Sequence, residues 1–504
     1  MGGTPMPRRG ATDETSVPQM RGECVITHSV MNRRAFLATA GTATAGLMTG
    51  CATETTPAGS AKKPNVVFVL ADQWRAQACG YAGDPNLQGK TPNLDKLAAE
   101  SVSFTHAVSC CPVCTPYRAS LITGQYPLTH GLFLNDLCLS TRATSIAQAY
   151  AGAGYDTAYI GKWHLDGHGR SAYIPPERRQ GFDYWKVLEC THDYNASAYY
   201  SGNDPARRRW EGYDVIAQTQ DAQAYIAGHA ANKKPYLLIL AWGPPHNPYE
   251  TAPEPYKKLF DAEKLTLRPN VEGDPRKGLA GYYAHIAAMD ACLGELLRAL
   301  EDAGQRDNTI FVFTSDHGDM LGSQGQSRKQ KPWDEAIRVP LLVRYPAAQA
   351  RGRAIGAPIN TPDLMPTLLG LSRVPIPPSV QGEDFSGVIR GAAAPEDNPV
   401  LIECPTPFGE WLRDKGGREY RGVRTRRYTY VRDLHGPWLM YDNETDPYQR
   451  TNLIDAPQHA ALQGKLEAEL QKLLKKTGDD FLPGPAYIAK WGYVVDKSGT
   501  VPIQ

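Results

Sequence analysis

The stretch NVVFVLAD, residues 65–72, decides the fold that we expect for this chain. Residues 66–71 are all apolar, and the run ends at a carboxylate, Asp72. An unbroken apolar run of this length is typical of a β-strand that is covered on both faces, as in a parallel sheet between helices. The chain repeats this pattern three times, and each run stops before a polar side chain: residues 157–160 before Lys162, 236–242 before His246, and 309–314 before Asp316.

Helical patterns separate these runs. Within residues 282–300, apolar side chains recur at spacings of three and four, at Ile286, Met289, Leu293, Leu296 and Leu297. Thr91-Pro92 predicts the start of another helix, because proline suits the first helical turn. Alternating strands and helices predict an α/β fold with a large, mostly parallel sheet between helices. Ligands bind beyond the carboxyl ends of such strands, so we expect the four polar residues that end the runs to share one crevice.

The first 61 residues have the pattern of a targeting leader and linker. Arg33-Arg34 precedes a weakly apolar stretch that ends at Cys51, which resembles a twin-arginine export signal. The stretch is too short and too polar to span a bilayer. Cys51 follows Gly50 as at a lipoprotein cleavage site, although Met48 stands where leucine is usual. We expect the twin-arginine machinery to export the protein, either to the periplasm or as a membrane-anchored lipoprotein, and lipidation of Cys51 stays open.

The pattern changes again from about residue 396. Residues 423–431 and 438–441 are predicted to be strands, and leucines at 462, 466, 470 and 473 mark a final amphipathic helix that ends at Gly478. We therefore expect three parts: the leader and linker at 1–61, the main α/β domain at 62–395, and a smaller antiparallel α+β subdomain at 396–504.

The charges of the chain balance. Lys and Arg number 54 and Asp and Glu number 53, which gives a formal net charge of +1. Such a chain carries no electrostatic footprint for nucleic acid or for an acidic membrane surface, so we expect no nucleic acid partner. The chain is 41% hydrophobic and contains 47 Gly and 40 Pro, which fits a large core joined by many loops. The composition favours a compact, loop-rich protein of enzyme size.

A second stretch, CCPVCTPYRASLITG at 110–124, places three of the ten cysteines within five positions. Cys111 and Cys114 have the spacing of a redox or zinc pair, but the chain has no second pair at zinc-ribbon spacing. Inert or disulfide-linked cysteines are the plainer interpretation. After Cys114, Thr115 can cap a helix and Pro116 suits its first turn. Cys114 is therefore expected at a helix N-terminus, where unpaired N–H groups favour an anion.

The same stretch resembles the signature of the formylglycine-dependent (type I) sulfatases, an arylsulfatase-like family of the alkaline phosphatase superfamily. Cys114-Thr-Pro-Tyr-Arg118 matches the pattern Cys-x-Pro-x-Arg, and the serine, leucine, threonine and glycine that follow agree as well. The resemblance implies that a formylglycine-generating enzyme converts Cys114 to formylglycine (3-oxoalanine). It also implies that Cys110 and Cys111 are packing or structural neighbours.

Further matches to this family extend over about residues 64–450. They comprise residues 65–75, 154–157, 161–165, 244–249, 314–318, Lys329, Tyr430 and 439–442. The resemblance implies an alkaline phosphatase-like fold and one divalent cation, expected to be Ca2+, with these ligands: Asp72, Gln73, Asp316, His317 and an oxygen of the modified Cys114. Gln73 departs from the family, in which aspartate is common at this position.

The resemblance also implies roles for the remaining polar residues. A sulfate ester needs an electrophilic clamp on its oxygens, a nucleophile and a proton donor for the leaving alcohol. Arg118 would lower the proton affinity of the hydrated aldehyde, and Lys162 and Lys329 would hold sulfate oxygens. His246 would protonate the departing sugar oxygen. His164 would help to deprotonate the second hydroxyl, so that sulfate leaves and the aldehyde returns.

The sequence leaves the substrate open. Polar and aromatic residues at 191–195, 207–210 and 408–413 suit sugar hydroxyls, sulfates and ring faces. Together with the export leader, they favour a sulfated extracellular carbohydrate. A phosphonate monoester or phosphodiester hydrolase built on the same core is one alternative. A non-catalytic lipoprotein that binds sulfated glycans is another.

Overall fold

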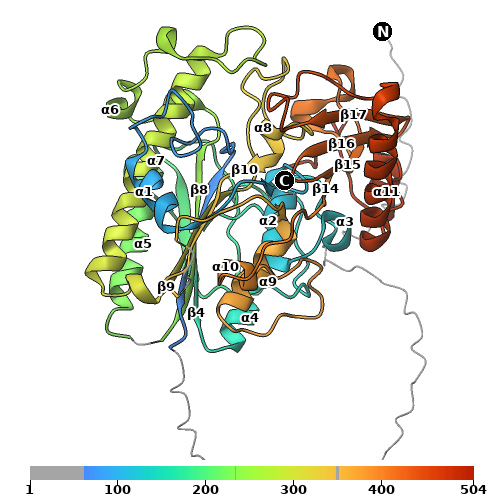
Figure 1. Ribbon diagram of the computed structural model, residues 1–504. Helices are drawn as coiled ribbons and strands as arrows, with labels where there is room; N and C mark the ends of the chain where they lie inside the picture. The colour runs from blue at the N-terminus through green and yellow to red at the C-terminus, as the bar shows by residue number, and fades with distance from the viewer. Residues whose placement is uncertain (1–61, 233, 348–350, 504) are drawn as a thin grey trace, which may run out of the picture. The chain divides into compact units, whose positions relative to one another are not determined.

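The computed structural model of the protein describes residues 62–232, 234–347 and 351–503. The predicted export leader, including Cys51, lies outside the described residues. Among the helices of the described part, none is both long and apolar enough to cross a membrane. This part of the chain contains a large sheet with helices on both faces, a three-stranded sheet and a four-stranded sheet (Figure 1).

The large sheet has ten strands in the order β12-β2-β11-β9-β1-β8-β4-β5-β6-β7. Their bounds are β1 Asn65–Asp72, β2 Val102–Phe104, β4 Asp156–Lys162, β5 Tyr184–Leu188, β6 Ala198–Ser201, β7 Asp204–Arg209, β8 Tyr236–Pro245, β9 Thr309–Ser315, β11 Leu341–Arg344 and β12 Ala354–Ile355. The central strands β9, β1, β8, β4 and β5 run parallel, with Val67 opposite both Leu238 and Phe311. Antiparallel neighbours flank them, β11 beside β9 and β6 beside β5. The prediction of a mostly parallel sheet is confirmed, and all four apolar runs are central strands.

Strand β1 is apolar throughout because each of its faces packs on a separate layer of helices. Val66 and Phe68 belong to an apolar cluster with residues of α2, α4 and α9, whereas Val67 and Val69 belong to one with residues of α1, α5 and α7. Figure 1 shows these two groups of helices on opposite sides of the sheet. Each fully buried side chain of this kind contributes roughly 1.5–3 kcal/mol, which fixes the strand between the layers. The bounds of these helices are α1 Pro92–Glu100, α2 Cys114–Thr123, α4 Ile146–Gly152, α5 Asp214–Gly228, α7 Arg276–Asp302 and α9 Leu364–Leu371.

The four-stranded sheet is antiparallel and follows chain order, β14-β15-β16-β17. Its strands and the helices after them are β14 Val400–Cys404, β15 Tyr420–Arg424, β16 Tyr428–Asp433, β17 Gly436–Asp442, α11 Ala460–Thr477 and α12 Gly484–Trp491. This confirms the smaller antiparallel α+β subdomain. The domain boundary at 395/396 stays a prediction. The remaining strands and α-helices of the described residues are β3 Ala107–Val108, β10 Arg338–Val339, β13 Ile359–Asn360, α3 Pro127–His130, α6 Glu254–Lys257, α8 Asp334–Ile337 and α10 Ser386–Ile389.

Two predictions for this subdomain were wrong in detail. Residues 423–431, predicted as one strand, form the end of β15, a turn, and the start of β16. The Thr425 hydroxyl accepts the N–H groups of Arg427 at 3.2 Å and Tyr428 at 2.8 Å, and this local bonding competes with a continuous strand. Helix α11 ends at Gly478 as predicted, but it is not the final helix, because α12 follows it.

Candidate active site

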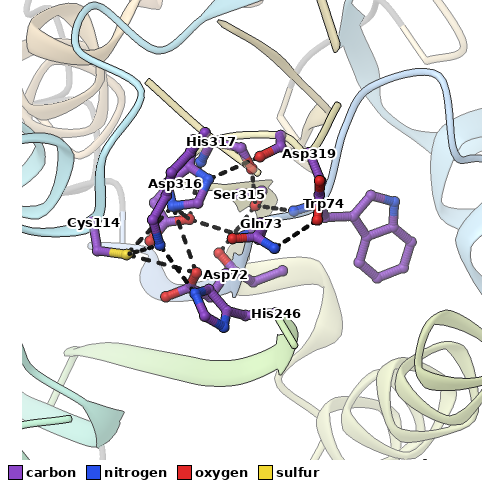
Figure 2. Close-up of polar contacts among 12 residues, drawn as sticks. Asp72, Gln73, Trp74, Cys114, His246, Ser315, Asp316, His317 and Asp319 are labelled. Atoms are coloured by element: carbon purple, nitrogen blue, oxygen red, sulfur yellow. Dashed lines mark hydrogen bonds and ion pairs between the residues drawn. The ribbon is translucent and has the colours of Figure 1, made fainter. Parts of the chain in front are cut away.

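Four strand ends and one helix start meet at the carboxyl edge of the parallel sheet. Asp72 is the last residue of β1 and Lys162 the last of β4, while His246 and Asp316 directly follow β8 and β9. Cys114 is the first residue of α2. Figure 2 shows the side chains of Asp72, Cys114, His246 and Asp316 gathered around one centre. The fold thus brings together the polar residues that end the four apolar runs.

The start of α2 is held by neighbouring loops. Val113, with extended backbone, is the residue before the helix, so Thr115 does not cap it as predicted. The Thr115 hydroxyl instead donates to the His164 carbonyl at 2.9 Å, and its N–H donates to Asn135 Oδ1 at 3.1 Å. Both bonds join the start of α2 to the loops around the site, and Cys114 occupies the helix N-terminus that the sequence predicts. The neighbours Cys110 and Cys111 are buried free thiols.

Atoms of the kinds that coordinate a cation lie around Cys114. One ligand atom each from Asp72, Cys114, Asp316 and His317 lies within 4.8 Å of the others. His317 Nε2 is 3.3 Å from Cys114 Sγ and 3.6 Å from an oxygen of each carboxylate. The Nδ1–H of His317 donates to the Gly318 carbonyl at 2.9 Å, which leaves the Nε2 lone pair facing the cluster. Two carboxylates and an imidazole so arranged are a donor set for a divalent cation.

Gln73 follows Asp72 and lies beside this set. Its backbone has a positive φ of 69°, and its N–H donates to Asp316 Oδ1 at 3.0 Å. The side-chain nitrogen donates to Asp319 Oδ2 at 2.6 Å, whereas Oε1 is buried and has no hydrogen-bond partner in the described structure. Figure 2 shows Gln73 among Asp72, Asp316 and Asp319. An unpaired buried amide oxygen beside two carboxylates is the group that a hard cation would satisfy, so the residues present fit such an ion.

Three basic side chains form a cradle around the same position. Lys329 Nζ lies 3.3 Å and Lys162 Nζ 3.7 Å from Cys114 Sγ. Lys162 also binds Asp72 at 2.6 Å. Arg118 donates to the carboxylates of Asp72 and Asp316 at 3.2 and 3.1 Å, and to the Lys162 carbonyl at 2.8 Å. All three cations are buried, so the cradle favours an anion with several acceptor oxygens, such as sulfate.

The charges of the site act on one another. Burial opposes ionisation of Asp72, but Lys162 and the other nearby cations outweigh it and hold the pKa of Asp72 well below its usual value. Burial and the Asp72 charge raise the pKa of Asp316 above its usual value. Burial raises the pKa of the Cys114 thiol, yet the lysines and His317 overcome it and lower that pKa well below normal. Position 114 therefore favours negative charge, and a bound cation would keep both carboxylates ionised.

The two predicted catalytic histidines have different partners. His246 Nδ1–H donates to the Asn247 carbonyl at 2.8 Å, and its Nε2 accepts from Lys329 Nζ at 3.0 Å. Burial and the Lys329 charge lower the pKa of His246 well below its usual value, so the ring is neutral. His164 Nε2 instead contacts Asp136 Oδ1 at 3.1 Å. Burial opposes its protonation, but Cys190, Asp136 and Cys114 raise the pKa of His164 to about 10.

These side chains open into a pocket of about 230 Å³. Of the predicted residues, its wall contains Cys114, Lys162, His164, His246 and Lys329, together with His192 and residues 408–410 of the predicted substrate loops. His192 stacks on His246 with the ring centroids 4.7 Å apart. Residues 207–210 do not line the pocket. Residues 207–209 belong to the edge strand β7, and Trp210 stacks on Tyr199.

The sequence analysis missed several residues of this pocket. They are Asn135, Asp136, Arg170, Cys190, Gln330 and Thr500. An Asn-Asp pair such as 135–136 predicts only a turn, so its sequence gives no sign that Asp136 contacts His164. Arg170 binds the same carboxylate at 2.8 Å. The sequence pattern therefore predicts His164 but not Asp136 and Arg170, the side chains next to it.

Fold and site together define a sulfatase. The Sulfatase family model matches residues 64–374, and the model named N-sulphoglucosamine sulphohydrolase, C-terminal, matches residues 322–476. The chain therefore belongs to the sulfatase family of the alkaline phosphatase superfamily. It is 47% identical over 446 residues to an ulvan-active sulfatase of Formosa agariphila, with 86% of each chain covered.

Two other proteins extend the likeness. The chain is 31% identical over 490 residues to an endo-4-O-sulfatase of Bacteroides thetaiotaomicron, which covers 85% of this chain and 95% of that one. A solved Bacteroides thetaiotaomicron structure, described with the metabolism of multiple glycosaminoglycans, superposes with a TM-score of 0.76 at 28% identity and covers 83% of this chain and 97% of that one. The predicted family, fold class and enzyme class are thus confirmed.

Proposed function

We propose that this sulfatase hydrolyses sulfate esters of an extracellular carbohydrate, with a formylglycine made from Cys114 as its nucleophile and Ca2+ as its metal. One observation carries the proposal: Cys114 Sγ lies 3.3 Å from both His317 Nε2 and Lys329 Nζ, between the cation ligands and the basic cradle. A nucleophile at this position would attack a sulfate group whose oxygens contact the lysines and the cation, which stabilises the charge that develops on them.

Asp72, Gln73, Asp316 and His317 would hold the cation. Mostly oxygen donors favour a hard ion such as Ca2+, while the imidazole of His317 also admits softer divalent ions. Bound there, Ca2+ would supply positive charge to a sulfate oxygen and to position 114. Gln73 in place of the common aspartate gives the cluster one negative charge fewer, which leaves a bound cation more electrophilic and less tightly held.

The chain's own residues would prepare the ester for attack. Hydrated formylglycine would supply two hydroxyls at position 114, one to attack sulfur and one whose deprotonation restores the aldehyde. Lys162 and Lys329 would bind the sulfate oxygens, since both ammonium groups lie within 3.7 Å of that position. Arg118, which bonds both carboxylates, would keep the ligands aligned and lower the proton affinity of the nucleophile.

Each histidine would change its charge during the reaction. The Lys329 charge disfavours protonation of His246, and the bound anionic ester would neutralise that charge, so the ring would take up a proton from solvent. His246 would then pass this proton to the leaving sugar oxygen. His164 would deprotonate the second hydroxyl. Its raised pKa depends partly on the thiols of Cys190 and Cys114, and conversion of Cys114 removes one of them. His164 of the mature enzyme would therefore reach its neutral form at lower pH.

The proposed substrate is a sulfated carbohydrate outside the cytoplasm. The names of two relatives, an ulvan-active sulfatase and an endo-4-O-sulfatase, support the proposal that the substrate is a glycan. The predicted twin-arginine leader supports export to the periplasm or to the membrane as a lipoprotein. This order of events is consistent: a formylglycine-generating enzyme modifies Cys114 before folding, and the twin-arginine machinery then exports the folded protein.

Mass spectrometry of the peptide that contains residue 114 tests the proposal. Protein from its native host, or from a host that also produces the formylglycine-generating enzyme, is expected to carry the aldehyde. A fully unmodified thiol in an active preparation would contradict the proposed nucleophile. The Cys114→Ser variant is the control, because it keeps the site but offers no thiol for conversion, and it should release no sulfate.

The two alternatives give different results. A phosphonate or phosphodiester hydrolase would turn over an aryl phosphonate faster than an aryl sulfate or a sulfated disaccharide. A non-catalytic glycan-binding lipoprotein would bind the disaccharide without releasing sulfate, even with formylglycine present. Sulfate release from the disaccharide at the highest kcat/KM of the three supports the proposal.

A further inference from the structure

The C-terminal residues 496–500 reach the catalytic pocket. Thr500 lines it together with Cys114, Lys329 and residues 408–410. It follows α12, far along the chain from the strands that carry the site, and none of the catalytic steps proposed above uses it. A side chain at the pocket wall that takes no part in sulfate binding is available to the other half of the ester, the alcohol.

The segment is a turn that its own residues hold closed. The Asp496 carboxylate accepts the Ser498 N–H at 2.8 Å, the Ser498 hydroxyl at 2.7 Å and the Thr500 N–H at 3.0 Å. The backbone adds two bonds, from Asp496 N–H to the Thr500 carbonyl at 2.9 Å and from Gly499 N–H to the Asp496 carbonyl at 3.0 Å. The Thr500 hydroxyl adds a sixth bond, at 2.9 Å from the Ser498 hydroxyl. Six bonds within five residues fix the turn, so Thr500 is presented by an ordered element.

The turn also packs on the loop at residues 408–410, which lines the pocket beside Thr500. Gly409 N–H donates to the Ser498 carbonyl at 3.0 Å. Gly499 has a positive φ of 69°, and a Cβ there would lie 3.3 Å from Phe408 Cβ, so the two segments pass in close contact. Phe408 in turn exchanges hydrogen bonds of 3.2 and 2.8 Å with the side chain of Gln330, next to the sulfate-binding Lys329. The turn is therefore held at a fixed distance from the sulfate cradle.

The chemistry of the wall differs from that of the cradle. The cradle is built from buried ammonium and guanidinium groups, whereas the turn and the adjoining loop offer the Thr500 hydroxyl and the Glu410 carboxylate. Because the Ser498 hydroxyl donates to Asp496, the Thr500 hydroxyl donates to Ser498 and keeps lone pairs that can accept. The Thr500 hydroxyl and the Glu410 carboxylate thus both offer acceptors, which suits the hydroxyl groups of a sugar ring and not a sulfate group. We propose that the turn at 496–500 is a specificity-determining element, in which Thr500 binds a hydroxyl of the sugar that carries the sulfate. This inference rests on the proposed function.

The test compares one sugar substrate with one substrate that lacks hydroxyls. Formylglycine-containing enzyme is assayed on ulvan oligosaccharides, within a panel of sulfated oligosaccharides, and on 4-nitrophenyl sulfate. Thr500→Val keeps the shape and removes the hydroxyl, together with its contact to Ser498. It is expected to lower the ratio of kcat/KM for the best oligosaccharide to kcat/KM for the aryl sulfate by about fivefold, the value of one neutral hydrogen bond. Thr500→Ser should restore most of that ratio.

Two further variants complete the test. Asp496→Ala removes the bonds that close the turn and should lower the ratio at least as much as Thr500→Val does. Lys497→Ala changes an exposed residue of the same turn that does not line the pocket, and should leave the ratio unchanged. Thermal unfolding midpoints of all variants show whether the fold is intact; if Asp496→Ala unfolds, the pair Thr500→Val and Thr500→Ser decides.

Several outcomes would overturn the inference. An unchanged ratio for Thr500→Val would show that its hydroxyl binds no sugar, and an equal loss on both substrates would show that the turn supports the fold or the chemistry instead. Failure of the proposed function is distinct, because it shows in the wild-type enzyme, which would then release sulfate from no oligosaccharide. Failure of the inference shows in the variants of an enzyme that does release it.

Discussion

The side-chain amide of Gln73 donates a hydrogen bond to Asp319 Oδ2 at 2.6 Å, while its oxygen is buried and has no partner among the described residues. Because an ionised carboxylate only accepts hydrogen bonds, Asp319 fixes which end of the amide faces it. Asp319 is itself held by the N–H groups of Leu321 and Arg328 at 3.1 and 2.9 Å and by the Tyr249 hydroxyl. The carboxylate thus orients the amide oxygen toward the proposed cation.

Asp319→Ala is therefore expected to weaken cation binding by about tenfold or more, the usual effect of losing a residue that orients a metal ligand. Asp319→Asn, which keeps one acceptor oxygen, should show a smaller loss. The measurement is calorimetric titration of Ca2+ into chelator-treated protein, which does not depend on turnover. Asp274→Ala, on an exposed loop, is the control. If Asp319→Ala bound Ca2+ as tightly as the wild-type protein, then Ca2+ binding by Gln73 would not depend on Asp319.

Strand β4 passes β8 so closely that residue 161 must be glycine. A Cβ there would lie 2.1 Å from the Ala241 carbonyl oxygen, and the backbone has a positive φ of 103°. We predict that Gly161→Ala lowers the free energy of unfolding by at least about 3 kcal/mol and reduces activity, because it also displaces Lys162. Gly152→Ala, with nothing within 4 Å of its Cβ, should change stability by less than about 1 kcal/mol. Urea unfolding of both variants tests this prediction. If Gly161→Ala were as stable as Gly152→Ala, strands β4 and β8 could move apart without a loss of stability.

The sequence predicts the centre of the fold and of the site for one physical reason. Strands β1, β4, β8 and β9 are buried on both faces, so they leave unbroken apolar runs, and the polar residues after them necessarily fall at one edge of the sheet. Cys114 is marked by its motif and by the helix that follows. These signals are local, so they can be recognised in a single sequence.

The parts that the sequence does not predict depend on contacts between distant segments. Asp319 matters because Gln73 lies against it, and Thr500 matters because the turn at 496–500 docks on Gly409. No periodicity records such contacts. The turn at 425–427 was missed for a different reason: a threonine hydroxyl replaces strand bonds with local ones, in a stretch whose flanks both have strand character.

Asp136 is one of the groups that favour the charged form of His164. Its carboxylate contacts His164 Nε2 at 3.1 Å and Arg170 at 2.8 Å. The thiolate of Cys190 and this carboxylate favour the charged ring and raise the pKa of His164. Asp136→Asn removes one of these negative charges, so the pKa of His164 should fall. If neutral His164 is the base that releases sulfate, the acidic limb of the kcat profile should move to lower pH.

The dependence of kcat on pH is measured on formylglycine-containing enzyme. Asp204→Asn, in an exposed ion pair with Arg208, is the control. A limb that stays in place while kcat falls uniformly would show that Asp136 positions His164 without setting its charge. A limb that moves to higher pH would contradict the sign of the interaction.

Asp334 joins the α/β part of the protein to the four-stranded sheet. This buried carboxylate on α8 bonds Arg424 of β15 at 3.0 Å and Arg338 at 2.9 Å. Burial opposes its ionisation, but the two arginines outweigh it and hold the pKa of Asp334 well below its usual value. A carboxyl group with a depressed folded-state pKa stabilises the fold above its unfolded pKa of about 3.9 and loses that contribution as the pH falls further.

Asp334→Asn should therefore lower the free energy of unfolding at pH 7 by about 3–5 kcal/mol, because it leaves the buried Arg424 guanidinium without a counter-charge. The difference between wild type and variant should be constant from pH 7 to about pH 5 and then narrow as the pH falls below about 4, where the wild-type carboxylate begins to lose its advantage. Urea unfolding across this range measures it, with Asp204→Asn again as a matched exposed pair that should show no resolvable change. A difference that grows toward acid would mean that folding raises the pKa of Asp334 instead of lowering it, and the pairing with the arginines would then not be what holds α8 against β15.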